Sequence, residues 1–408
     1  MPTKDIWFNE HQYPAGVKNY SKTRPMRVEE FETEAAWWGD AADGFAARVE
    51  GQFAWKVSAD DIKARNYNLD CKNPHVGEQV SHDSAALLAD YARMQQGIAE
   101  LREQLKTVLG EALERDPADF RDSGPQLAEH FHTLFTTEAS IDALKQALVH
   151  LAVMGKLVPA NEGQASAANV LAAIDAARTT YEATPGLRTR QRTEQGEAMV
   201  EPPYPAPNGW KWRNLGSLLH ITGGVTLGRK LSERQLVSLP YLRVANVQRG
   251  FLVLDQIKEI DVPVEEVEKY KLAFGDLLTT EGGDWDKVGR TAIWRDEIEQ
   301  CLHQNHVFRS RPYTEHFSSR WVELYLNSAP ARAYFAGSSK QTTNLASINM
   351  TQLRACAFPV PPLGEQHRII AKVDELLALC DKLKLGLAQA RQHHAHLAAV
   401  LVEQAVAT

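Results

Sequence analysis

The stretch FPVPPLGEQHRIIAKVDELLALCDKLK, residues 358–384, decides the fold of this chain. After its prolines, apolar side chains recur at alternating steps of four and three residues, well beyond the quoted stretch. That period is typical of a coiled coil rather than of an amphipathic surface helix. The seam consists of Ile369, Val373, Leu376, Cys380, Leu383, Leu387, Ala390, His394, Leu397 and Leu401. We predict one long helix over 361–408 whose seam needs a partner.

The length of this helix predicts a spacer. From Ile369 to Leu401 it would extend ~48 Å at 1.5 Å per residue. His394 is the polar interruption of the seam, and we assign it to the choice of partner or register. A metal role would need further ligands, which the neighbouring sequence does not supply.

Residues 209–360, upstream of the helix, have a different character. Short apolar runs alternate with turn residues, as is typical of strands: LLHITGG, PYLRVANV, FLVLDQI, DLLTTEGG, RTAIWR and NHVFRS. The segment SRWVELYLNSAPARAYFAG has a helical pattern instead. The sequence therefore predicts that residues 209–360 form a mixed α/β domain. With the separate long helices, the whole chain belongs to the α+β class.

The N-terminal half is predicted to be mainly helical. Residues 83–114 form a strong amphipathic helix that closes a segment over 1–115, whose first 80 residues are irregular and rich in tryptophan. A helical region follows over 127–185. There Thr137 is expected to cap a helix that ends near Gly155, before a second helix at 167–183. The polar, proline-rich stretch 186–208 is interpreted as an exposed linker.

Composition restricts the class of protein. With 408 residues, 44% hydrophobic and 24% charged, the chain can form two or three globular domains. The net charge of −7 is uneven: residues 205–360 carry +3 and the remainder −10, so one segment can approach phosphate. No apolar run is long enough to span a membrane. Four dispersed cysteines, without a signal peptide, indicate a cytoplasmic protein.

Three short motifs suggest catalysis, and each has a simpler interpretation. EPPY at 201–204 resembles the amino-group clamp of DNA methyltransferases, but glutamate is one methylene too long and no glycine-rich cofactor loop precedes it. TGGVTLGRK at 222–230 lacks the Ser or Thr that follows the lysine of a phosphate loop. Glu281, Asp284 and Asp286 near Lys287 suggest a metal-dependent nuclease, a DNA-contacting loop or a solvated turn.

Several stretches resemble type I restriction-modification specificity subunits. Residues 358–384 resemble the start of their conserved spacer helix, and residues 127–160 resemble their N-terminal conserved helix. PNGWKWRNLGSLLHITGG at 207–224 resembles the opening of a target recognition domain, and the following strands and loops match as well. The resemblance covers about 280 residues. It implies a single recognition domain, and therefore a half-subunit, where a full specificity subunit has two.

The N-terminal segment has a second resemblance. IWFNEHQYPAGVKNYSKTRPMRVEEF at 6–31, the tryptophan pair at 37–38 and FAWKVSADDIKARNYNLDCKNPH at 53–75 resemble the C-terminal tail of type I adenine-N6 DNA methylation subunits. The catalytic domain of those subunits has no counterpart here. The chain thus resembles a methylation-subunit tail fused to a specificity half-subunit.

The resemblance implies a non-catalytic subunit that recognises double-stranded DNA. Two copies would pair as a homodimer through the spacer helices and bind a bipartite target, while the helices hold methylation subunits and, in some systems, a restriction subunit. This chain would need no cofactor or metal. S-adenosylmethionine, and ATP with Mg²⁺, would belong to the partner subunits. Two alternatives remain: an assembly or decoy protein without DNA specificity, and an autonomous nuclease or methyltransferase.

Polar and basic residues on predicted loops are the candidates for DNA contact. Arginine, asparagine and glutamine match base edges, and lysine and arginine match phosphates. The candidates are Arg229, Lys230, Arg243, Asn246, Gln248, Trp285, Lys287, Arg290, Lys340, Gln341, Thr342, Thr343 and Asn344.

Overall fold

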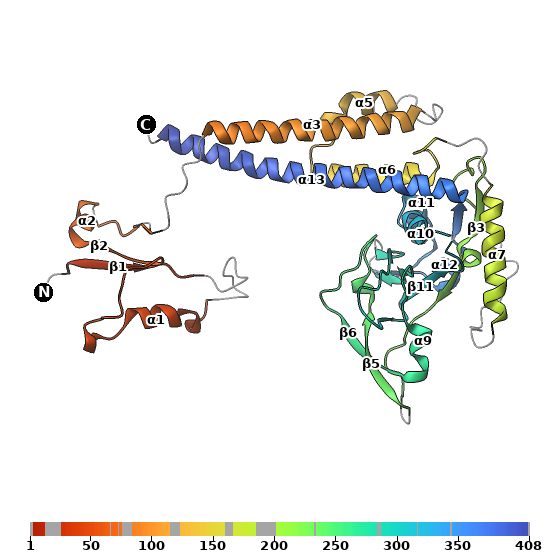
Figure 1. Ribbon diagram of the computed structural model, residues 1–408, viewed down its shortest axis with the longest axis horizontal. Helices are drawn as coiled ribbons and strands as arrows, with labels where there is room; N and C mark the ends of the chain where they lie inside the picture. The colour runs from red at the N-terminus through yellow and green to blue at the C-terminus, as the bar shows by residue number, and fades with distance from the viewer. Residues whose placement is uncertain are drawn as a thin grey trace. The chain divides into compact units, whose positions relative to one another are not determined.

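Two compact units make up the chain in the computed structural model (Figure 1). The first comprises Met1–Ala92 with His393–Thr408, and the second Arg93–Gln392. The boundaries fall inside two long helices, α3 (Ser84–Glu114) and α13 (Leu363–Val406). The structure describes residues 3–12, 26–65, 67–71, 73–75, 84–114, 123–159, 166–184, 201–231, 234–283, 287–315, 317–342 and 345–406.

The first unit contains a two-stranded antiparallel sheet of β1 (Asp5–Asn9) and β2 (Ala54–Ser58), with helices α1 (Glu32–Trp38) and α2 (Ala59–Ala64). Phe8 stacks on the buried Trp55 at a ring-centroid distance of 5.5 Å, which joins the two strands on one face. The sequence predicted helical and irregular structure here and missed this strand pair.

The helices of the second unit begin where their caps predict. In α6 (Glu138–Val153) the Ser140 amide donates to Thr137 Oγ1 at 3.2 Å, and the Thr137 amide donates back to Ser140 Oγ at 3.1 Å. Gly155 follows with a φ of +71° and ends the helix, as predicted. The remaining helices before the mixed domain are α5 (Ser123–Leu134) and α7 (Ala167–Ala183).

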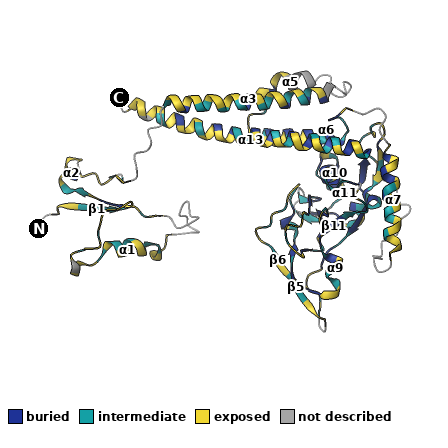
Figure 2. Ribbon diagram, in the orientation of Figure 1, coloured by how far each residue is buried: buried dark blue, intermediate teal, exposed yellow. Residues whose placement is uncertain are grey.

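The seam of α13 is buried within the chain itself. Ile369, Val373, Leu376, Cys380 and Leu383 are fully buried, whereas His394 and Leu401 are exposed. Figure 2 shows buried and exposed positions alternating along this helix. The long helix and its period are therefore confirmed. Helices of the same chain cover the buried part of the seam, and pairing with a second copy stays a prediction.

Helix α6 covers α13 in antiparallel orientation. Lys384 Nζ lies 2.8 Å from Asp142 Oδ2, and Lys145 is paired with Asp381. The predicted apolar stripe of α6, which includes Ile141, Leu144, Leu148 and Leu151, is buried. Because these ion pairs are partly exposed, each contributes little, and the buried stripe supplies most of the stabilisation.

Helix α3 covers α13 farther along. A Cβ atom at Gly386 would lie 3.4 Å from Ile98 Cγ1, so the two helices are in contact there. Ile98, Leu105 and Leu109 of α3 are buried. Helix α5 is tied to α3 by Arg102, whose Nε donates to the Phe135 carbonyl at 3.1 Å. These contacts form a helical layer around α13 (Figure 1).

The second unit also contains the predicted mixed domain. Its sheets have the strand orders β4-β11-β7-β9, β10-β5-β6, β12-β13-β8 and β14-β3. Its strands are β3 (Lys211–Asn214), β4 (Leu219–Thr222), β5 (Leu236–Leu242), β6 (Lys258–Pro263), β7 (Leu277–Thr280), β8 (Gly282–Gly283), β9 (Thr291–Ile293), β10 (Leu302–His303), β11 (Val307–Pro312), β12 (Lys340–Thr342), β13 (Leu345–Ser347) and β14 (Ala357–Val360). Its helices are α8 (Leu215–Leu218), α9 (Val267–Tyr270), α10 (Ser319–Leu326), α11 (Ala329–Ser338) and α12 (Met350–Ala355).

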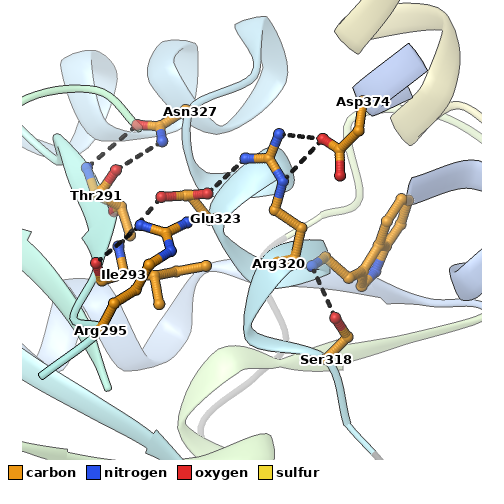
Figure 3. Close-up of polar contacts among 9 residues, drawn as sticks. Thr291, Ile293, Arg295, Ser318, Arg320, Glu323, Asn327 and Asp374 are labelled. Carbon is orange, nitrogen blue, oxygen red and sulfur yellow. Dashed lines mark hydrogen bonds and ion pairs between the residues drawn. The ribbon is translucent and has the colours of Figure 1, made fainter. Parts of the chain in front are cut away.

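Helix α10 joins this domain to α13. The buried Glu323 accepts hydrogen bonds from the Ile293 amide at 3.1 Å and from Arg320 Nη1 at 2.5 Å (Figure 3). Arg320 Nη2 also donates to Asp374 of α13 at 2.5 Å. Asn327 forms a two-way pair with the backbone of Thr291. One turn of helix thus holds both the sheet and the long helix.

A buried histidine makes the stability of this domain sensitive to acid. His303 is fully buried, and its Nδ1 donates to the Val307 carbonyl at 2.7 Å. Burial, and then the charge of Arg309, lowers the pKa of His303 to about 3. The folded domain therefore keeps the neutral imidazole, while the unfolded chain takes up a proton below about pH 6.5.

We expect the contribution of His303 to the free energy of unfolding to be complete above pH 6.5. It should fall by about 2 kcal/mol at pH 5. Urea denaturation of the wild type and of His303→Gln at both pH values tests this, and the variant should lose that part of the pH dependence. His306→Gln is the matched control, because His306 is about half exposed. Equal pH dependence in wild type and His303→Gln would contradict the assignment.

Candidate nucleic-acid interface

The sheet β12-β13-β8 brings two predicted contact segments together. Ala346 and Ser347 of β13 pair with Gly283 and Gly282 of β8. A Cβ atom at Gly282 would lie 2.6 Å from the Ala346 carbonyl oxygen, so this close pairing requires glycine. The glycine-rich loop with Lys287 and Arg290 therefore lies beside the polar stretch 340–347, which forms a hairpin where the sequence indicated only a loop.

A third predicted segment joins the same edge. Arg290 Nη1 donates to Gln248 Oε1 at 2.6 Å, and the Gly250 amide donates to the Thr291 carbonyl at 2.9 Å. Arg249 Nη2 donates to the Val288 carbonyl at 3.4 Å. We call the assembled surface the loop edge. It comprises Gln248, Arg249, Phe251, Lys287, Arg290 and the strands β12 and β13.

Arg249 and Phe251 of the loop edge were missed by the sequence analysis. Arg249 contacts Val288, 39 positions away along the chain, and Phe251 lies in the same turn as Arg249, so the local sequence pattern gives no signal for either. The sequence also predicted a strand over 251–257. That prediction was wrong, because these residues form turns with a single bridge between Val247 and Leu252.

Four candidates do not present their side chains as part of the loop edge. Arg229 Nη1 lies 2.7 Å from Glu266 Oε2, and Arg234 Nη1 lies 2.7 Å from the other oxygen of that carboxylate. The Arg229 hydrogen bond in particular lowers the pKa of Glu266. Lys230 is exposed beside this pair. Arg229 is thus engaged in an ion pair within the domain, which disfavours it as a DNA contact.

The other two hold a turn together. Asn246 is buried, its Oδ1 accepts from the Arg243 amide at 2.9 Å, and its Nδ2 donates to the Val253 carbonyl at 2.8 Å. Arg243 Nη2 donates to the Gln256 carbonyl at 2.8 Å. The side chain of Asn246 supports the turn from inside, which disfavours the predicted base contact.

Three candidates, Trp285, Thr343 and Asn344, lie outside the described residues. For Lys340, Gln341 and Thr342 the backbone of β12 is described and the side chains are not. DNA contact by these six residues stays a prediction.

The motifs that suggested catalysis have structural roles where they are described. Tyr204 of EPPY donates its hydroxyl to the Val153 carbonyl at 2.6 Å, and burial raises its pKa. This part of the predicted exposed linker is therefore anchored on the end of α6. A Cβ at Gly224 would clash with the His303 carbonyl at 1.9 Å, so this glycine serves packing rather than phosphate binding.

The acidic cluster is only partly described. Glu281 Oε2 lies 2.6 Å from His306 Nδ1, while Asp284 and Asp286 lie outside the described residues. Within the described part of the chain, no group of three or more His, Cys, Asp or Glu side chains is placed to hold a metal ion. None of the helices in that part is long and apolar enough to cross a membrane.

The fold and the loop edge define a mixed helix-and-sheet domain carried on a long helix. Residues 207–390 match the family described as the type I restriction modification DNA specificity domain, and residues 1–83 match the family described as N-6 DNA methylase. Over residues 207–390 the chain is thus similar to type I specificity domains, and over residues 1–83 it is similar to N-6 DNA methylases.

Individual relatives agree with both matches. The type I restriction enzyme EcoAI specificity subunit of Escherichia coli is 31% identical over 310 residues, 74% of this chain and 51% of that subunit. The type I restriction enzyme EcoEI methylase subunit of Escherichia coli is 61% identical over 113 residues, 28% of this chain and 23% of that subunit. The chain thus spans about half the length of the specificity subunit that it matches.

A solved structure of the HsdS subunit from Thermoanaerobacter tengcongensis aligns with 67% of this chain and 58% of its own. It does so at 17% identity with a TM-score of 0.34.

Proposed function

We propose that this chain is a non-catalytic specificity half-subunit of a type I restriction-modification system, and that its loop edge recognises one half of a bipartite double-stranded DNA target. The observation that carries the proposal is the assembly of the loop edge from three separate segments of a specificity-family domain. Arg249, Lys287 and Arg290 supply positive charge for phosphates and guanine, and Gln248 supplies an amide for base edges.

The helical layer supports an assembly role beside recognition. Helix α3 follows directly on residues 1–83, which are similar to N-6 DNA methylases, and it covers the seam of α13. We propose that this packing reproduces, within one chain, a contact between methylation and specificity subunits. A methylation subunit would then dock beside these helices and supply the methyl transfer, and a restriction subunit would join where the system contains one.

A bipartite target requires two recognition domains, so the proposal includes a second copy of this chain. The copies would pair through the spacer helices, using faces of the helical layer that α3 and α6 do not cover. The whole complex would act in the cytoplasm, as the four unpaired cysteines suggest.

Selection of bound sequences from a random double-stranded DNA library tests the proposal, using the full chain with and without a cognate methylation subunit. We expect a two-part inverted repeat with a fixed gap. Enrichment of a single half-site would support DNA recognition and would contradict the pairing of two copies. If the folded protein enriches no sequence in the presence of the methylation subunit, the assembly or decoy alternative replaces the proposal.

A further inference from the structure

Phe251 is exposed at the end of a rigid turn. Its side chain is 56% accessible to solvent. The Gln248 amide donates to the Phe251 carbonyl at 3.0 Å, and Gly250 closes the turn with a φ of +80°. The bridge between Val247 and Leu252 fixes the base of the turn. The ring is therefore presented on a defined backbone rather than on a loose loop.

The neighbours of Phe251 distinguish it from an ordinary exposed phenylalanine. Single exposed apolar residues are common and need no explanation. Here Arg249 precedes the ring in the same turn, and Gly250 ties the turn to Thr291, one residue from Arg290. An aromatic ring among basic and amide side chains is the pattern that nucleic-acid surfaces use.

The polar neighbours favour the major groove over the minor groove. Arginine pairs with guanine, and glutamine pairs with adenine, through donor and acceptor patterns that only the major groove displays in full. Gln248 lies in the same turn as Phe251, and its side chain accepts a hydrogen bond from Arg290 Nη1 at 2.6 Å. In that groove the C5-methyl group of thymine is the apolar group that a phenyl ring can cover.

We propose that Phe251 is a specificity-determining residue that packs against the C5-methyl group of a thymine in the major groove. The inference rests on the proposed DNA recognition. It adds which base is recognised, thymine, and which side chain recognises it, Phe251. A ring pressed against phosphate would gain nothing, whereas a buried methyl group contributes a factor of about four in affinity.

The test compares selected sequences and modified DNA. Wild-type chain should prefer thymine at one position of the selected half-site, and replacing that thymine with uracil should weaken binding about fourfold. Phe251→Ala should lose the preference at that position alone, and it should bind the thymine and uracil duplexes equally. Phe274→Ala is the matched control, since Phe274 is 73% exposed on a different turn of the same domain; it should behave as wild type. Unfolding midpoints check that both variants are folded.

The other possible results would contradict either the assignment of Phe251 or the proposed DNA recognition. If Phe251→Ala keeps the wild-type preference at every position, or still distinguishes thymine from uracil, the assignment of Phe251 is wrong while DNA recognition stands. A uniform loss of affinity, with unchanged preference, overturns it as well. If the wild type enriches no sequence at all, the proposed function fails and this inference fails with it.

Discussion

Replacing Glu323 with alanine is expected to lower the free energy of unfolding of the second unit by about 3–5 kcal/mol. The side chain is 1% exposed and satisfies two donors, the Ile293 amide and the Arg320 guanidinium. Alanine leaves the amide buried without an acceptor and leaves Arg320 without the buried one of its two carboxylate partners. Guanidinium chloride denaturation followed by tryptophan fluorescence measures the loss.

Two matched variants separate the contributions of the hydrogen bonds and ion pairs around Glu323. Glu323→Gln keeps an oxygen for the Ile293 amide, and burial already raises the pKa of Glu323, so we expect a loss of only about 1 kcal/mol. Asp374→Asn removes a partner that is 49% exposed, and it should cost about 0–1 kcal/mol. A Glu323→Ala protein that unfolds within 1 kcal/mol of wild type would show that the cluster is incidental to stability.

The helices could be predicted because their signals are local. The period of α13, the cap of α6 at Thr137 and the amphipathic pattern of α3 each lie within a few turns of one helix. What covers α13 was not predictable in the same way. A heptad seam specifies that a partner helix exists, but not whether that helix belongs to the same chain.

The loop edge was only partly predictable, because its contacts are non-local. Residue type alone selected Gln248 and Arg290, which the structure brings together at 2.6 Å across 42 positions of sequence. The same reasoning also selected Asn246 and Arg229, which serve a buried turn and an ion pair. Residue type reports what a side chain can bind, whereas burial and partners decide whether it is presented to DNA.

Replacing Arg290 with alanine is expected to reduce affinity for the selected DNA about 5- to 150-fold and to relax the preference at one base pair, as for an arginine that pairs with guanine. Gln248 Oε1 accepts from Arg290 Nη1 and orients the guanidinium on the loop edge. Arg290→Lys should not restore the preference, because an ammonium group lacks the planar fork that pairs with two guanine acceptors. Repeated library selection with each variant, at a fixed salt concentration, measures both effects.

Arg229→Ala is the control, because Arg229 has the same side chain in the same domain but is paired with Glu266 away from the loop edge. It should leave affinity within about twofold and the selected sequence unchanged. If Arg290→Ala instead weakens all sequences equally and reduces the slope of log affinity against log salt by about one, Arg290 contacts phosphate, not a base. If Arg229→Ala changes the selected sequence and Arg290→Ala does not, DNA binds on the Arg229 side of the domain, and the loop edge is not the recognition surface.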